Sequence, residues 1–563
     1  MTSITELDHS PVPGKEYFSI DREGREEFIY FLLVDRFHDD APRQPTAGPA
    51  RSQGIVTPDT FYGGTLKGVE QHLDYIGGLG CTALWLSPIF ENNPDAYHGY
   101  NINNYLDVDP HFGTKQDLID LVSSAHARTP PMKVFLDVVI NHSGDNWFYR
   151  DDDDRLYADD VQYDFGGWRR TDRPIPTELR NPAYYHRRGG ITGNGWDTYP
   201  EMQHGDIVSL KDFANDDDQP GAELINILIA AHCHWIREAD VDGFRVDAVK
   251  HMGELACSRF SSMIREYAYS LGKRDFFLFG EAASPSDDLY DRYIGPNTSR
   301  SDDETVFFGI TSLLDFRLAQ GARGGRGRTG LRDVMKGVAD PRALIDRLEA
   351  QRHRALNRGE LGRYLVTFVD NHDHFWQPDG RISAGASDEQ VIASVGYLLC
   401  ALGTPCIYYG TEQGFQGQGE DLAIREAMFD RDRPGVDLLN TDCRIYRQIA
   451  SIASVMRNEP ALRFGRMYFR QISGDGVHFG YPYGSEYTLA FSRLLYGEEV
   501  LVAYNVSASP RQDRVVVDSA LHKAQAPLRF LYGGTGDVRV DAAPDGTLFT
   551  RLALEGHQFA ILK

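Results

Sequence analysis

Three acidic side chains stand where short apolar runs end, and there they could perform acid–base and nucleophilic chemistry. Asp247 ends the run Gly-Phe-Arg-Val-Asp, Glu281 ends Phe-Leu-Phe-Gly-Glu, and Asp373 ends Phe-Val-Asp-Asn-His-Asp. Opposed carboxyl groups can serve as nucleophile and general acid in a reaction with an oxocarbenium-like transition state. Each acid alone is ambiguous, but the three together predict chemistry of this type.

Arg245 and Asp247 lie two residues apart in one apolar run. Residues i and i+2 of a strand face the same side, so these two side chains should be neighbours. A guanidinium group favours the ionised form of a nearby carboxylate, and an ionised carboxylate is a usable nucleophile. A purely structural ion pair is the alternative for this pair taken alone. Glu281 emerges from an apolar strand, and partial desolvation there favours the protonated form that a general acid needs, as does a second carboxylate such as Asp373.

The elements that must position these acids form a regular pattern. Short apolar runs alternate with longer helical patterns, for example at 224–237 and 254–269, which indicates βα units around a parallel sheet. Nearly continuous apolar runs are typical of strands buried on both faces. Eight such runs, the number that a (β/α)8 TIM barrel needs, lie at 28–33, 83–86, 134–140, 243–247, 276–281, 313–316, 364–370 and 406–410. Polar residues end several of these runs, and the C-terminal ends of barrel strands carry the chemistry of this fold.

Two stretches depart from this pattern. Residues 145–220 are rich in Asp, Trp, Tyr, Gly and Pro and are too long for a plain loop, which predicts a small inserted domain. From about residue 465 the chain reads as short β segments, which predicts a C-terminal antiparallel domain. The expected division is an N-terminal extension at 1–22, a barrel at 23–144 and 221–460, an insertion at 145–220 and a β domain at 461–563.

Composition narrows the choice of partners. The chain has 58 basic and 82 acidic side chains, a net charge of −24, and such a surface repels nucleic acid and anionic membranes. No run approaches the roughly 18 apolar residues of a membrane helix. The Gly- and Arg-rich stretch 321–330 is interpreted as a mobile insertion between late barrel elements. Neither composition nor motifs specify an oligomeric state.

The expected location is the cytoplasm. The first ten residues have neither the basic nor the apolar region of a signal peptide. Six cysteines lie in apolar surroundings without the spacing of a disulfide framework, which predicts buried free thiols.

Four segments resemble, in family order, the signature regions of the α-amylase family of glycoside hydrolases. They are Asp137-Val-Val-Ile-Asn-His142, Gly243-Phe-Arg-Val-Asp-Ala-Val-Lys-His251, Phe279-Gly-Glu281 and Phe368-Val-Asp-Asn-His-Asp373. Further matches are Tyr97-His-Gly-Tyr100 and the segments 108–114 and 403–412, so the resemblance covers residues of about 28–430. It implies the same α/β architecture: a (β/α)8 TIM barrel, an inserted domain B after the third strand and a C-terminal antiparallel β-sandwich domain C.

The resemblance also implies roles for single residues. Asp247 matches the nucleophile, Glu281 the general acid/base and Asp373 the third acid, which stabilises the transition state. Arg245 matches the arginine that orients the nucleophile. The matches for sugar-binding residues are Tyr100, His142 and His372 in subsite −1, and Lys250 and His251 on the acceptor side of members that act on α-1,4-glucans.

A structural Ca²⁺ between barrel and domain B is a further implication. Asn141, the carbonyl group of His251 and Asp212 match its ligands, although Lys211 stands where the family commonly has proline. Calcium prefers such hard oxygen ligands. The alternative is that Asn141 only hydrogen-bonds domain B.

Three functions are compatible with these residues. The first is a retaining hydrolase that cleaves α-1,4-glucosidic bonds in malto-oligosaccharides or α-glucans. The second is a transglycosylase that passes the same covalent intermediate to a sugar acceptor. The third, an inactive sugar-binding member, is disfavoured because all three acids are present.

Overall fold

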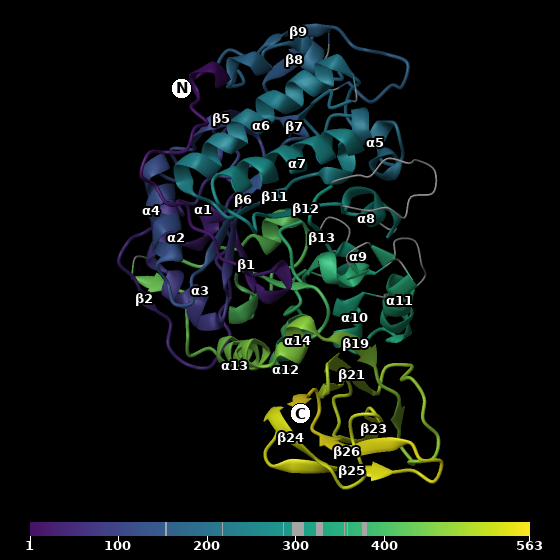
Figure 1. Ribbon diagram of the computed structural model, residues 1–563. Coiled ribbons are helices and arrows are strands. Elements are labelled where there is room, and N and C mark those ends of the chain that lie inside the picture. Colours follow the sequence, from purple (N-terminus) through teal and green to yellow (C-terminus); the bar gives the residue numbers. More distant parts are fainter. Residues whose placement is uncertain are drawn as a thin grey trace.

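The eight apolar runs form the strands of a closed parallel barrel in the computed structural model (Figure 1). The last strand, β17 (Thr404–Tyr408), pairs with the first, β1 (Ile29–Leu32), and closes it. The strands between them are β3 (Ala83–Leu86), β6 (Lys133–Val138), β11 (Gly243–Val246), β12 (Phe277–Gly280), β13 (Ser312–Leu314) and β16 (Leu365–Thr367). All their residues are buried, as continuous apolar runs require, so the predicted TIM barrel is confirmed.

The structure describes most of the chain. The described residues are 1–151, 155–216, 218–284, 287–295, 309–321, 330–353, 355–356, 359–373, 380–433 and 435–563. The predicted Gly- and Arg-rich insertion lies, except for its two end residues, outside them. In the described part, no helix combines the length and the apolar character that a membrane crossing requires.

Helices surround the barrel, and local sequence sets their ends. α6 (Gln219–Ala239) begins after Asp218, whose side chain caps it, and ends at Asp240 in a left-handed conformation. α7 (Glu254–Ser270) packs against α6. α12 (Asp388–Cys400) begins with a capping box, as does α4 (Lys115–His126). These helices follow the apolar 3.6-residue period of the sequence.

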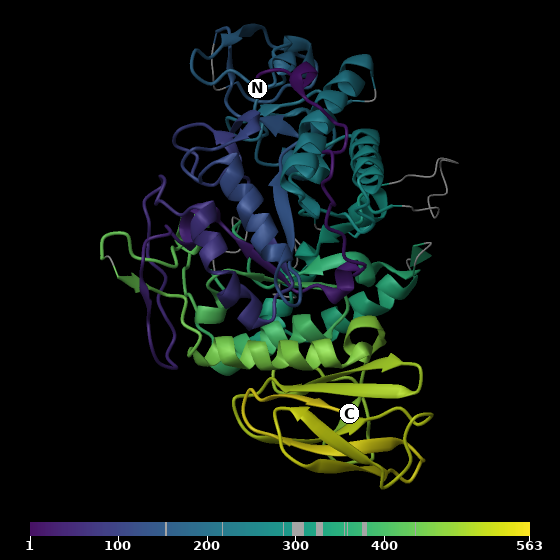
Figure 2. The same cartoon turned by 60° about the vertical axis from the view of Figure 1, so that its left-hand side comes forward.

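An insertion separates β6 from α6 and sits at one end of the molecule (Figures 1 and 2). Its backbone is tied to the barrel where β7 (His142–Ser143) pairs with β10 (Lys211–Asp212). A second hairpin joins β8 (Trp147–Tyr149) to β9 (Phe165–Trp168), and its rings pack on one another. A short helix, α5 (Glu201–His204), completes the part used below. The predicted domain after the third strand is therefore present.

The C-terminal sheet lies at the opposite end of the molecule (Figure 2). Its nine antiparallel strands run from β19 (Arg466–Phe469) to β27 (Phe559–Leu562) and curl around an apolar core of their own. Helices α12, α13 (Arg444–Asn458) and α14 (Pro460–Phe464) contact this sheet. The predicted C-terminal antiparallel domain is confirmed.

The six cysteines are buried and free, as expected.

Candidate active site

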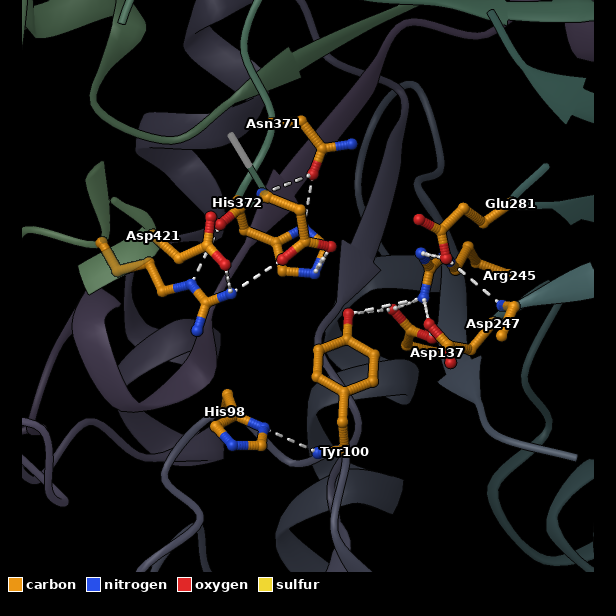
Figure 3. A network of polar contacts seen from close by, with 12 residues as sticks. His98, Tyr100, Asp137, Arg245, Asp247, Glu281, Asn371, His372 and Asp421 are labelled. Atoms are coloured by element: carbon orange, nitrogen blue, oxygen red, sulfur yellow. Dashed lines mark hydrogen bonds and ion pairs between the residues drawn. The ribbon is translucent and has the colours of Figure 1, made fainter. Parts of the chain in front are cut away.

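One buried guanidinium group gathers three carboxyl groups at the C-terminal ends of neighbouring strands (Figure 3). Arg245 Nη1 donates to both oxygens of Asp137, at 2.9 and 3.0 Å, and to Asp247 Oδ1 at 2.6 Å. Its Nη2 lies 3.0 Å from Glu281 Oε2. Asp137 is the register partner of Arg245 on β6, while Asp247 and Glu281 directly follow β11 and β12. The predicted proximity of Arg245, Asp247 and Glu281 is thus what the structure shows.

The pKa values of Asp247 and Asp137 are raised, although Arg245 alone would lower them. Burial raises the pKa of Asp247 well above its usual value; Arg245 opposes this shift, and the neighbouring carboxyl groups add to it. Burial also raises the pKa of Asp137 to about 6. The positive charge of Arg245 thus lowers the pKa of Asp247, but burial and the neighbouring acids raise it more. One cation is shared by three acids. Arg245 therefore favours the ionised form of Asp247 that a nucleophile needs, against the opposing effects of burial and of the neighbouring acids.

Asp373 belongs to a second group, organised by another arginine. Arg425 Nη2 donates to Asp373 Oδ1 at 2.8 Å, and its Nε donates to the carbonyl oxygen of His372 at 3.0 Å. Asp421 lies 3.5 Å from the same Nη2. The sequence reading missed Arg425, which lies 52 residues after Asp373 in a segment without strand periodicity. No sequence pattern marks that contact.

Tyr100 joins the two groups (Figure 3). Its hydroxyl donates to Asp137 Oδ2 at 2.8 Å, and its ring stacks on His372 with 5.3 Å between centroids. The backbone N–H of Tyr100 donates to His98 Nδ1 at 3.1 Å. His98 is another site neighbour that the sequence reading did not select, although it stands within the matched segment 97–100. The half-buried Tyr100 side chain therefore contacts both the Arg245 group and His372.

Burial favours the uncharged form of the two histidines that are predicted for subsite −1. Burial lowers the pKa of His142 to about 4 and that of His372 well below its usual value. Both ring nitrogens of His142 are buried and hydrogen-bond no other residue of the described chain. The neutral imidazole of His142 is therefore suited to hydrogen-bond the hydroxyl groups of an uncharged ligand. In His372, Nδ1 lies 2.5 Å from Asn371 Oδ1 and Nε2 lies 3.2 Å from Asp373 Oδ2.

Lys250 and His251 lie apart from the Arg245 group, in the short 3-10 helix Val249–His251. Lys250 Nζ donates to Asp197 Oδ1 at 3.1 Å and to the carbonyl oxygen of Ala283 at 2.9 Å. His251 Nδ1 lies 2.6 Å from the carbonyl oxygen of Met202. Both side chains thus bind the part of the insertion that borders the site.

Of the predicted metal ligands, the structure brings Asn141 and Asp212 together. Asn141 Nδ2 donates to Asp212 Oδ1 at 3.3 Å, and His186 Nδ1 lies 2.5 Å from Asp212 Oδ2. Burial raises the pKa of Asp212 to about 7, although His186 opposes the shift. The link to His251 is indirect: Asn215 Nδ2 lies 3.5 Å from Asn141 Oδ1, and Asn215 Oδ1 accepts the N–H of Gly253. The amide and carboxylate oxygens are ligands of the kind that calcium takes, and both are buried.

Comparisons with known proteins agree with this geometry. The family model described as "Alpha amylase, catalytic domain" matches residues 31–438. The alpha-amylase of Streptomyces lividans is 31% identical over 592 residues, which cover 92% of this chain and 59% of that protein. The cyclomaltodextrin glucanotransferase of Klebsiella oxytoca is 28% identical over 486 residues, which cover 78% of this chain and 66% of that protein. The chain therefore spans less than two thirds of the length of these two curated relatives.

A solved structure resembles nearly the whole chain. The alpha-amylase of Geobacillus thermoleovorans, crystallised with acarbose, superposes with a TM-score of 0.68 and 25% sequence identity. The match covers 96% of this chain and 99% of that one. The similarity therefore extends beyond the barrel to the insertion and the C-terminal sheet.

Proposed function

This chain belongs to the alpha-amylase family, and from that premise we propose that it cleaves α-1,4-glucosidic bonds of malto-oligosaccharides or α-glucans with retention of anomeric configuration. The observation that carries the proposal is the Arg245 guanidinium group, which holds Asp247 and Glu281 at the ends of adjacent strands. An acid and a nucleophile that flank one sugar ring are what double displacement requires.

The proposed reaction has two steps. Glu281 donates a proton to the glycosidic oxygen, and an Asp247 oxygen forms a bond to the anomeric carbon as the bond to the leaving sugar breaks. Glu281, now ionised, removes a proton from water; the water oxygen attacks the anomeric carbon and displaces Asp247. Asp373 stabilises the positive charge that develops on the sugar ring in both steps.

The remaining residues bind and position the sugar in this proposal. Tyr100 stacks on the ring in subsite −1, while His142 and His372 hydrogen-bond its hydroxyl groups. Arg245 orients Asp247, and Arg425 holds Asp373 through the 2.8 Å contact. Lys250 and His251 shape the acceptor side, which supports action on a glucan chain.

The stereochemical outcome tests the proposal. Adjacent barrel strands are about 4.8 Å apart, which suits the roughly 5–5.5 Å between carboxyl groups of a retaining enzyme better than the roughly 6.5–9.5 Å of an inverting one. We expect a β-glucosyl–Asp247 intermediate and release of the α-anomer. NMR of the first product, recorded before mutarotation, checks this. A β-anomer that appears first would assign the carboxyl groups other roles.

Transglycosylation is the second candidate, because curated relatives include cyclomaltodextrin glucanotransferases. Both reactions share the covalent intermediate, and the acceptor that reaches it decides the product. Chromatography of maltoheptaose digests over time separates them. Hydrolysis adds one reducing end per cleavage, whereas transfer conserves the number of reducing ends.

We also propose that Asn141, Asp212 and the carbonyl group of His251 hold a structural Ca²⁺. When bound, the ion supplies positive charge between the barrel and the insertion. The amide of Asn141 needs only a half-turn to direct Oδ1 toward Asp212, since the nitrogen and oxygen of an amide occupy equivalent positions. A chelator should lower the melting temperature and added Ca²⁺ should restore it, because an ion that binds only the folded state stabilises it. Protein without calcium and without a response to chelator would make Asn141 an anchor of the insertion alone.

Two further proposals concern the domain division of the chain and the location of the protein. The expected domain division places the insertion at 145–220 and the C-terminal domain at 461–563; limited proteolysis with mass spectrometry of the fragments tests it. The six buried thiols support the cytoplasm as the location.

A further inference from the structure

We propose that His186, His204 and Asp216 form a binding site for a zinc-like divalent ion, with Asp212 as the residue that orients His186. The site lies where the insertion meets α6 and is separate from the acids of the active site. Its ligands differ in kind from the oxygen ligands proposed for calcium.

The three side chains converge on one point. His186 Nε2 lies 3.1 Å from Asp216 Oδ2, and His204 Nε2 lies 3.6 Å from Asp216 Oδ1. One ligand atom from each side chain lies within 4.8 Å of the other two. Zinc bonds of about 2.0–2.2 Å at tetrahedral angles separate ligand atoms by roughly 3.3–3.6 Å. A small inward movement of the two rings therefore gives zinc geometry, with water in the fourth position.

The hydrogen bond of His186 prepares it as a ligand. Its Nδ1 lies 2.5 Å from Asp212 Oδ2 and its Nε2 lies 3.1 Å from Asp216 Oδ2, so both ring nitrogens face carboxylates. A zinc ion would displace the proton of Nε2, while Asp212 keeps the proton of Nδ1 in place. A carboxylate that fixes the far side of an imidazole is the usual support of a histidine bound to zinc. Two imidazole nitrogens and one carboxylate suit zinc, whereas calcium prefers oxygen alone.

His38, His72 and Asp437 form a second cluster of similar composition. It shows that closeness of the side chains alone does not make a metal site. There His38 Nδ1 accepts the backbone N–H of Asp40 at 3.2 Å. The ring proton of neutral His38 is then on Nε2, the atom that faces Asp437 at 3.9 Å. Because Nδ1 of His38 already accepts a hydrogen bond, Nε2 could bind a metal ion only if the ring became an imidazolate. This cluster therefore serves as the internal control.

Burial and access also favour the proposed site. The side chains of His186 and His204 are 7% and 16% exposed, while that of Asp216 is 46% exposed. The imidazoles are thus held within the fold, and an ion can enter past the carboxylate.

A bound ion would link three segments of the chain. His204 is the last residue of α5, and Asp216 precedes α6. The same short helix contributes the Met202 carbonyl that contacts His251, and Gln203 Nε2 donates to the carbonyl oxygen of Met252 at 2.8 Å. The ion would therefore fix the part of the insertion that borders Lys250 and His251.

Calorimetric titration with Zn²⁺ tests the proposal on the 563-residue chain without a histidine tag, stripped of metal and then saturated with Ca²⁺. We expect one equivalent of Zn²⁺ to bind, and His204→Ala and Asp216→Asn each to weaken binding at least tenfold. The control His72→Ala should bind Zn²⁺ like the wild type. Circular dichroism and melting temperature verify that each variant is folded.

A second measurement is independent of the variants. Co²⁺ in the wild-type protein should give the intense visible absorption of a four-coordinate site, and Zn²⁺ should displace it. Absence of stoichiometric Zn²⁺ binding, wild-type affinity in both variants, or loss of binding in His72→Ala would each overturn the proposal. If a variant fails to fold, His204→Gln, which keeps most of the side-chain volume, replaces it.

Discussion

The two halves of the active site each contain one arginine, but the arginines reach their acids in different ways. Arg245 is fully buried on a barrel strand; Asp137 stands on one neighbouring strand, while Asp247 and Glu281 directly follow β11 and the other neighbouring strand. Arg425 lies beyond the last barrel strand and reaches Asp373 across 52 residues of sequence. Strand register thus fixes the first half, whereas tertiary packing of loop segments fixes the second. We expect substitutions in the first half to reduce the rate of bond cleavage more than substitutions in the second half.

The largest effect should follow from breaking the Arg245 half. Asp247→Asn removes the proposed nucleophile, and Glu281→Gln removes the proton donor while keeping its size. General acid–base catalysis alone contributes about 10²- to 10⁴-fold, and loss of the nucleophile should cost at least as much. Turnover of maltoheptaose by purified variants measures this, with the exposed Asp120→Asn as control. Rates like the wild type in either variant would remove the catalytic assignment.

A smaller loss should follow in the other half. Arg425→Ala deprives Asp373 of a charged hydrogen-bond donor, an interaction of about 1.5–3 kcal/mol. We expect kcat/KM on maltoheptaose to fall about 10- to 100-fold, with the fold intact by circular dichroism. A loss as large as that of Asp247→Asn would show that the two halves act as one unit. Unchanged kinetics would show that Asp373 needs no partner.

The same contrast explains how much the sequence could predict. Continuous apolar runs give all eight strands, and strand order alone places Asp247 beside Glu281. Arg425 and the contact between His186 and Asp212 could not be predicted in this way. They join segments that are distant in the chain, and neither a helical nor a strand period marks such a contact. Asp137 was visible as a polar residue within an apolar run, but its sharing of Arg245 depends on the register of β6 against β11.

Tyr100 allows a finer separation of the halves, because it contacts both. Tyr100→Phe removes the 2.8 Å bond to Asp137 and keeps the ring that stacks on His372. We expect kcat to fall about tenfold, the scale of one hydrogen bond to a charged group, with little change in KM. Tyr100→Ala, which also removes the stacking surface, should raise KM as well. Equal kinetics for the two variants would assign the whole contribution of Tyr100 to its hydroxyl group.

The smallest effect on bond cleavage should come from Lys250, which contacts neither arginine group in the hydrogen bonds described above. Its ammonium group joins Asp197 of the insertion to the carbonyl oxygen of Ala283, just past Glu281. Lys250→Ala should therefore loosen the acceptor side and leave the reacting carboxyl groups in place.

A substrate with an activated leaving group needs little help on the acceptor side, so its cleavage should fall only a few-fold in Lys250→Ala. The product distribution from maltoheptaose should shift more, since it depends on how the acceptor side holds the sugar chain. Chromatography of the products and the rate on a nitrophenyl maltoside measure the two effects, with the exposed Lys67→Ala as control. If the rate on the activated substrate falls as much as the rate on maltoheptaose, Lys250 acts on the reacting acids themselves and belongs to the Arg245 half.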